Sequence, residues 1–432
     1  MAHTTNSSPT LLRGIGRFDF IALIINITIG AGILGLPAKL YTLVGTWSLL
    51  AYGMSALVVT LIILCFAEVS SRFSETGGPY LYARVAFGPL IGFEVGWLFW
   101  LSRIAAFASI CNLFVNYASL LRPQLAGGWE RIGLMVALVA SLALLNYIGV
   151  QRSARINTIF TVSKLLVIGL FAVAGLFFID TAAFSLPPLP AYSPFSQAVL
   201  LLIFTFSGFD VATIPSGEVQ QPQRTVPLSL LVAIGTVALL FIAVQIVCIG
   251  TLPDLARSER PLADAARQFM GPAGAVFITV VALLTALGTL HALMLTGPRL
   301  LFAMAEQKQL PGWLAKTHPR FRTPALAIFI TATLQLVLAI TGTFLYALTL
   351  STLIRLAYFA LTSAAVPVLR ARSDVPPARF KLIGGRLISG LAVLLCIWLL
   401  SNSSGREARD VAIAGGVGFI IFALMNRRQR PS

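Results

Sequence analysis

Long apolar segments separated by short polar ones run through nearly the whole chain. Twelve of them can be bounded, at residues 18–41, 46–70, 90–120, 131–150, 156–179, 195–217, 227–250, 272–304, 324–342, 346–369, 386–401 and 411–426. An α-helix rises ~1.5 Å per residue, so about 20 residues cross a ~30 Å hydrocarbon layer. Segment 386–401 is short, but most of the others reach this length. The pattern therefore predicts an all-α polytopic membrane protein with twelve transmembrane helices.

Two of these predicted helices are interrupted by glycine and proline. The first segment contains GAGILGLP at 30–37, and the sixth contains FTFSGFDVATIPSGE at 204–218. Broken backbone inside a membrane is tolerated only where it is buried in protein or lines a cavity. Two broken helices at matching places in the two halves of a chain are typical of a transporter binding site, where helix N-termini face anionic substrate groups. We therefore predict unwinding near Gly30–Gly35 and Ser207–Ala212, around a substrate.

Composition and charge support this class and orient the chain. The 432 residues are 57% hydrophobic and 11% charged, with 31 Lys+Arg against 15 Asp+Glu and a net charge of +16. With the N-terminus inside, twenty Lys/Arg fall in cytoplasmic segments and seven, or eight with Lys39, fall on the other side. The positive-inside rule then places both termini in the cytoplasm. The basic charge is explained by topology in a plasma (bacterial inner) membrane, so we expect a lipid bilayer and no nucleic acid as partner.

Two polar connections and the cysteines complete the outline. Residues 74–88 predict a short cytoplasmic interfacial helix, and residues 251–271 predict a lid helix outside, with ordinary amphipathic linkers as the alternative for both. The four cysteines all fall in apolar segments and are interpreted as small core residues, at Cys65, Cys111, Cys248 and Cys396. Because no histidine or cysteine cluster has metal-ligand spacing, we expect no metal and no cofactor.

The sequence around the breaks resembles the amino acid–polyamine–organocation superfamily, in the form of a bacterial amino acid permease. The resemblance is carried by GAGILGLP at 30–37, GGPYLYARVAFGP at 77–89, SGFDVATIPSGEVQQPQRTVP at 207–227 and TGPRLLFAMAEQKQLP at 296–311. It implies a five-plus-five inverted repeat over 18–180 and 195–370. Two more helices would then follow in 386–426, with cytoplasmic tails at 1–17 and 427–432.

The same resemblance implies that a substrate amino acid binds between the two broken helices. Backbone N–H groups of residues 30–32 would bind its carboxylate. Carbonyls near Phe204, Thr205 and Ser207 would bind its amino group, with Phe204 as a gate. Ala31 and Leu34 depart from the Ser and Phe that are common in relatives. The expected substrate-binding residues are Ile29, Gly30, Ala31, Gly32, Ile33, Arg103, Phe204, Thr205, Ser207, Gly208 and Asp210.

Lys164 is a charged residue inside the predicted membrane segment 156–179. The alternative to a functional role is a lysine whose side chain extends to the inner interface. The resemblance implies that proton-coupled members carry a lysine here, where sodium-coupled relatives bind Na⁺. We therefore predict proton-coupled transport with Lys164 as the coupling residue, so that protons are a second partner. Uncoupled exchange, with Lys164 as a fixed cation, is the alternative.

Arg103 lies deep in segment 90–120, and the predicted charge of the substrate depends on the partner of its guanidinium. An ion pair with Asp210, or with Glu94, would neutralise it, because an unpaired buried charge costs several kcal/mol. If it instead faces the cavity, its guanidinium offers a forked donor to a second anionic group, and an acidic amino acid or amine would be preferred. We favour the Arg103–Asp210 pair and a neutral amino acid.

Weaker candidates surround these residues. His291 is interpreted as a proton relay or a packed residue, and Arg355 as a paired or cavity-facing cation without a named partner. Glu68 and Glu218 are gate candidates that would pair with basic residues at 72, 84 or 224, or lie solvated at helix ends. No nucleophile with a base and no paired carboxylates within a span point to an enzyme, so no catalytic residue is expected. A receptor does not need two matched breaks, and no repeated filter sequence points to a channel.

Overall fold

The computed structural model describes residues 15–73, 77–148, 154–214 and 219–429, and only the backbone of residues 154–161 and 428–429. Apart from one isolated bridge between Ile15 and Val219, the described residues form helices and their connections. The α-helices are α1 Arg17–Thr28, α2 Ala31–Val44, α3 Ser48–Ser70, α4 Gly78–Phe87, α5 Pro89–Ala118, α6 Gly128–Ile148, α7 Ala154–Leu176, α8 Tyr192–Phe206, α9 Phe209–Ala212, α10 Pro222–Thr251, α11 Pro261–Glu306, α12 Ala325–Thr341, α13 Phe344–Ala371, α14 Gly385–Ser401 and α15 Gly405–Gln429.

Each predicted apolar segment coincides with one or two of these helices. In the described part of the chain, eight helical stretches are long and apolar enough to cross a membrane, and three shorter apolar helices accompany them. The all-helical membrane architecture is thereby confirmed, whereas the count of twelve spans stays a prediction. The first apolar segment contains two helices, α1 and α2, and the sixth contains α8 and α9.

Helix α5 forms the centre of the bundle. Most of its side chains are buried, and it packs against α13, α11, α12 and α4. Helix α15 is the opposite case, because large apolar side chains such as Phe419 and Ile420 are exposed along it. A helix that is apolar on its outer face suits contact with lipid rather than water. The buried centre and the apolar rim together fit a protein whose solvent is the bilayer.

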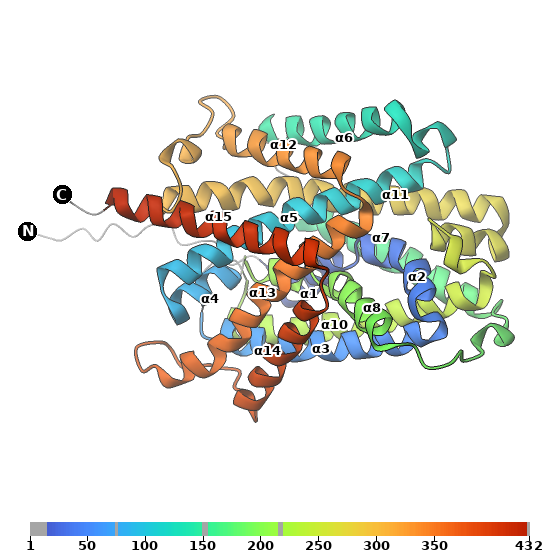
Figure 1. Cartoon of the computed structure of the whole chain (residues 1–432), viewed down its shortest axis with the longest axis horizontal. Coiled ribbons are helices and arrows are strands. Elements are labelled where there is room, and N and C mark those ends of the chain that lie inside the picture. Colours follow the sequence, from blue (N-terminus) through green and yellow to red (C-terminus); the bar gives the residue numbers. More distant parts are fainter. Residues whose placement is uncertain (1–14, 74–76, 149–153, 215–218, 430–432) are drawn as a thin grey trace, which may run out of the picture.

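The connections rich in Lys and Arg gather at one end of the molecule. In Figure 1, α4, the connections α11–α12 and α13–α14, and the C-terminal end of α15 all lie at the left, whereas the connections α7–α8 and α10–α11 lie at the right. This arrangement matches the two sides predicted from charge, although which side is cytoplasmic stays a prediction. The described part of the segment 74–88 forms α4, so the predicted short helix is confirmed, whereas its place at the cytoplasmic interface stays a prediction.

The predicted lid segment is partly helical. It contains a short turn of helix at Leu255–Arg257 and the start of α11, whose backbone kinks at Gly271 with φ 70°. Leu262 and Ala265 are buried, and Thr42 of α2 donates a hydrogen bond to the Ala256 carbonyl (3.0 Å). The segment is therefore packed onto the end of α2 in this structure. The tail residues 1–14 and 430–432 and the residues 74–76, Arg152, Arg155 and Glu218 lie outside the description of side chains.

Candidate functional site

The first break separates α1 from α2 at Ile29 and Gly30. Ile29 is extended (φ −75°, ψ 90°) while its N–H still donates to the Ile25 carbonyl (2.8 Å), and Gly30 is also non-helical (φ −129°, ψ −143°). Helix α2 starts at Ala31. The first N–H groups of a helix have no carbonyl partner within it, and they carry its positive dipole end. The free N–H groups and the positive dipole end of α2 therefore both lie at the first break.

The predicted unwinding from Gly30 to Gly35 is too long. Helix α2 runs without interruption from Ala31 through Pro37 to Val44. The later glycines serve close packing instead. A methyl group on Gly32 would overlap Thr205 Oγ1 and lie 2.8 Å from Thr205 Cα, and one on Gly35 would lie 2.7 Å from Phe344 Cζ. The glycines of this segment therefore indicate close contact between helices as well as broken backbone.

The second break separates α8 from α9 at Ser207 and Gly208. Ser207 is extended (φ −79°, ψ 159°), and Gly208 has φ 127°, a conformation that favours glycine because it has no Cβ. A Cβ at Gly208 would also lie 3.0 Å from the Ile27 carbonyl. Helix resumes at Phe209, so the predicted unwinding to Ala212 is again too long. The last backbone carbonyls of α8, which have no partner within the helix, lie at this break. The first N–H groups of α2 lie at the other break.

Asp210 is the centre of a buried polar network at the second break. Its side chain is 0% exposed and accepts hydrogen bonds from the Gly208 N–H (3.0 Å) and the Tyr358 hydroxyl (2.7 Å). Arg355 forms the ion pair, with 3.5 Å between Nη1 and Oδ1. The predicted Arg103–Asp210 ion pair is therefore wrong among the described residues, where Asp210 pairs with Arg355. This contact also gives Arg355 the partner that the sequence did not name.

Arg103 lies near this network, and among the described residues no carboxylate oxygen lies within 4.0 Å of its guanidinium. It is 3% exposed, and its guanidinium lies over the ring of Phe99, 4.4 Å from the ring centre. Within the described residues, Arg103 Nη2 has no hydrogen-bond partner, and neither does the buried Thr205 Oγ1. Cation–π contact offsets part of the cost of burying a guanidinium but does not satisfy its N–H groups. The site therefore contains an unsatisfied cationic donor.

Lys164 lies on α7 beside the first break. Its Nζ donates to the Ile29 carbonyl (3.5 Å), and the side chain is buried. Helix α7 packs against α1, which brings the ammonium to the residue where α1 ends. A carbonyl at a helix C-terminus carries the negative dipole end and attracts a cation. The geometry thus joins Lys164 to the break, while its role in coupling stays a prediction.

The other predicted residues are distributed as follows. Ala31, Ile33 and Phe204 are buried, and the Ser207 hydroxyl donates to the Ile203 carbonyl (2.5 Å). The predicted gate role of Phe204 stays a prediction, although Arg355 approaches its ring to 5.9 Å. His291 is half-buried on α11. Two residues of the site were not singled out, Phe99 and Tyr358.

Glu68, the described member of the two gate candidates, lies away from both breaks. It accepts two hydrogen bonds of 2.6 Å from Arg370 and lies 3.8 Å from Arg72. The pairing with Arg72 agrees with one predicted partner, but the main partner is Arg370. Its carboxylate joins α3 to α13, so its observed contacts are structural.

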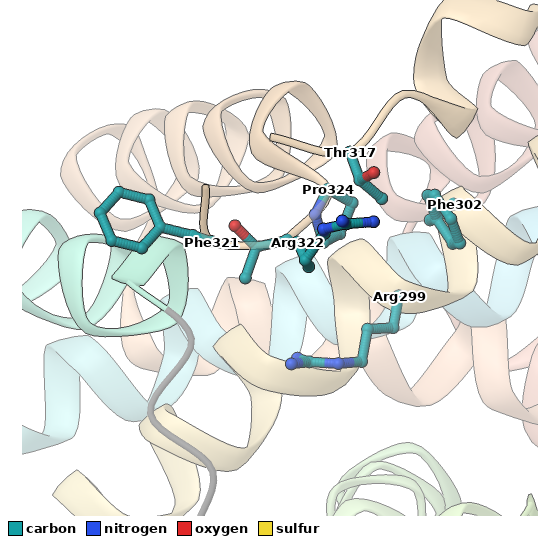
Figure 2. Close-up of a pocket in the computed structure, with 7 residues that line it drawn as sticks. Arg299, Phe302, Thr317, Phe321, Arg322 and Pro324 are labelled. Atoms are coloured by element: carbon teal, nitrogen blue, oxygen red, sulfur yellow. The ribbon is translucent and has the colours of Figure 1, made fainter. Parts of the chain in front are cut away.

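A cavity of about 390 Å³ lies beside the connection between α11 and α12. Figure 2 shows that Arg322 and Arg299 approach it from different segments, with Arg299 on α11. Arg299 Nη1 already donates to the Leu295 carbonyl (2.5 Å) and to Asn146 (3.2 Å). The residues of the two breaks do not line this cavity, so it is separate from the site described above.

Comparison with known proteins identifies the family of the chain. A family model described as amino acid permease matches residues 15–424. The methylthioribose transporter and the branched-chain amino acid permease BcaP of Bacillus subtilis are each 27% identical over 98% of this chain and 95% of their own. The serine/threonine exchanger SteT of the same organism is 27% identical over 78% of both chains. The three names describe a transporter, a permease and an exchanger.

Proposed function

The chain belongs to the amino acid permease family, and from this premise we propose that it is a secondary active transporter. It carries an amino acid across the plasma membrane by alternating access. The observation that carries the proposal is the meeting of the two breaks, where Gly32 contacts Thr205 and Gly208 contacts Ile27. The proposed inverted repeats occupy 18–180 and 195–370, with both termini in the cytoplasm.

The substrate is proposed to bind between the two helix ends. Its carboxylate accepts hydrogen bonds from the N–H groups that begin α2, at residues 30–32. Its ammonium group binds carbonyls that end α8, at residues 204–207. Opposite helix ends favour opposite charges, so a zwitterion suits the gap between them.

Proton coupling is proposed to act through Lys164. The buried ammonium contacts the Ile29 carbonyl at the first break, so its charge acts directly on the backbone next to the proposed carboxylate site. A change in its protonation would alter the stability of that conformation. Uncoupled exchange remains the alternative, with a permanently charged Lys164.

The proposed substrate is a neutral amino acid, in line with the names of BcaP and SteT. A second candidate is a substrate with an additional anionic group. The specific observation in its favour is Arg103, whose Nη2 lacks a partner among the described residues while Asp210 is engaged by Arg355 and Tyr358. Charge-assisted hydrogen bonds of a guanidinium to a carboxylate are among the stronger polar contacts.

A ligand panel tests the function. Purified protein is heated with neutral, acidic and basic amino acids and with amines, and uptake of each stabilising compound is measured in proteoliposomes. A ligand at 100 times its Kd that binds only the folded state adds about 2.7 kcal/mol of stability, so the melting temperature rises measurably. Absence of both stabilisation and uptake across the panel would refute the proposal.

A further inference from the structure

A second cavity, of about 490 Å³, lies where α3 and α13 end and α14 begins. Five cationic side chains line it, from Arg72, Arg370, Arg372, Lys381 and Arg386. We call it the basic cavity. It lies on the side that the charge distribution predicts to be cytoplasmic, and it is far larger than the ~30 Å³ that one water occupies. A group larger than water therefore fits in it.

The carboxylates near the basic cavity are fully engaged. Both oxygens of Glu68 accept hydrogen bonds from Arg370, and Oε2 also accepts one from the Leu382 N–H (2.9 Å). Asp374 accepts hydrogen bonds from Nε and Nη2 of Arg372, one on each carboxylate oxygen. Five cations against these two carboxylates leave three positive charges in excess. The fold thus concentrates positive charge here without neutralising it.

Three of the cations retain unused capacity for an anion. Arg72 is 6% exposed, and its buried Nε has no hydrogen-bond partner among the described residues. Lys381 and Arg386 are exposed, and within the described chain neither has a carboxylate oxygen within 4.0 Å. A buried guanidinium nitrogen without a partner costs free energy, which an anionic acceptor would offset.

The backbone that carries these cations is fixed in place. Arg72 donates to the Pro376 carbonyl (3.0 Å), and the Phe380 N–H donates to Ser71 Oγ (3.1 Å), so α3 holds the α13–α14 connection at two points. At Gly385, a Cβ would overlap the Arg370 guanidinium and lie 2.8 Å from its Cζ. Cations held in position before binding lose less conformational entropy when an anion arrives.

An apolar surface borders the basic cavity. Ile383 and Leu387 are 96% and 69% exposed, and Leu391 and Leu394 continue the exposed row along α14. Residues spaced three and four apart share one face of a helix, so this row runs from the segment of Lys381 and Arg386 along one face of α14. The cavity and the row together offer a cationic recess beside a surface that suits acyl chains.

We propose that the basic cavity binds a phosphate group, and that its source is the headgroup of an anionic phospholipid whose chains lie along α14. Basic pockets between membrane helices on the cytoplasmic side are suited to such headgroups. The cavity in Figure 2 differs, because Nη1 of its Arg299 already donates to Asn146 and to the Leu295 carbonyl. The lipid site is independent of the identity of the transported substrate.

The test compares the full-length protein with the variant Lys381→Gln/Arg386→Gln. The matched control is Lys316→Gln/Arg320→Gln, which removes two exposed cations from the α11–α12 connection on the same side. Each protein is melted in phosphatidylcholine nanodiscs with and without phosphatidylglycerol, and in detergent with inorganic phosphate at constant ionic strength. Native mass spectrometry counts the phosphatidylglycerol that remains bound.

Phosphatidylglycerol is expected to stabilise and remain bound to the wild type and the control. Two cations near a membrane surface contribute enough that the Lys381→Gln/Arg386→Gln variant should bind about 30-fold more weakly. Stabilisation by phosphatidylglycerol alone identifies the lipid headgroup as the source. Equal stabilisation by inorganic phosphate supports the phosphate site but overturns the lipid source. No stabilisation of the wild type by either, or an equal loss in the control, overturns the whole proposal.

Discussion

The two breaks differ in what holds their backbone in place. At the second break, Asp210 accepts from the Gly208 N–H and the Tyr358 hydroxyl and pairs with Arg355. At the first break, the Lys164 ammonium donates a hydrogen bond to the Ile29 carbonyl, at 3.5 Å. That distance exceeds the usual 2.7–3.2 Å of an N–H···O hydrogen bond. Among the described side chains, a network holds the backbone of the second break, whereas one long contact from Lys164 reaches the backbone of the first break at Ile29.

This difference assigns the two breaks different parts in a transport cycle. A network of several mutually supporting contacts resists any single change. A single ammonium–carbonyl contact is altered by the gain or loss of one proton. We therefore expect the second break to act as the fixed reference and the first break to respond to the coupling ion. The following predictions test this assignment.

The largest effect is expected from Asp210→Ala, which removes the centre of the network. It leaves Arg355 buried without a counter-charge, and breaking such a pair costs about 3–5 kcal/mol. We expect a strongly lowered melting temperature and loss of uptake. The double variant Asp210→Ala/Arg355→Ala should recover part of the stability, because the stranded charge is gone. A double variant no more stable than Asp210→Ala would contradict the network.

Lys164→Ala is expected to act on the cycle rather than on the fold. Concentrative uptake in proteoliposomes should be lost, whereas exchange and the melting temperature should be largely retained. Wild-type uptake should rise as the outside is acidified and should not depend on Na⁺. Lys164→Arg is the matched control, since it keeps the charge but releases a proton far less readily. A strict Na⁺ requirement in the wild type would end the proposal of proton coupling.

The smallest effect is expected from Arg103→Ala. This variant tests whether a substrate between the two breaks has a second anionic group that binds Arg103. Because Asp210 already has Arg355, the melting temperature should change little. Affinity for an acidic substrate should fall about 10- to 100-fold, the equivalent of one hydrogen bond to a charged group. Affinity for neutral amino acids should be nearly unchanged. An equal loss for acidic and neutral substrates would remove Arg103 from substrate selection.

The position of both breaks was predictable from the sequence, but their length was not. Glycine followed by proline marked Gly30 and Gly208 correctly, because both glycines are in non-helical backbone. The same signal overestimated the unwound region, since Gly32 and Gly35 are glycines for contact with other helices. Glycine frees the backbone and also permits close approach, and the sequence alone does not distinguish the two.

The partner of Asp210 was mis-assigned for a different reason. Arg103, Arg355 and Tyr358 come from helices whose register against α9 is set by packing of the whole bundle. Arg355 and Tyr358 are three residues apart and so share a face of α13, which is a signal that the sequence does contain. This spacing identifies a polar face of α13, but it does not show that Asp210 lies opposite that face. Long-range pairing of charges needs the tertiary structure.

The contact of Gly32 with Thr205 has a consequence for the evolution of the chain. One of the atoms that a methyl at position 32 would meet is the Thr205 Cα, at 2.8 Å, so a smaller side chain at 205 makes no room. The same holds at Gly208, where the obstacle is the Ile27 backbone carbonyl. No compensating substitution at the facing position relieves either clash. Descendants of this chain should therefore keep both glycines or lose the close contact of the two helices, and intermediate sequences should be rare.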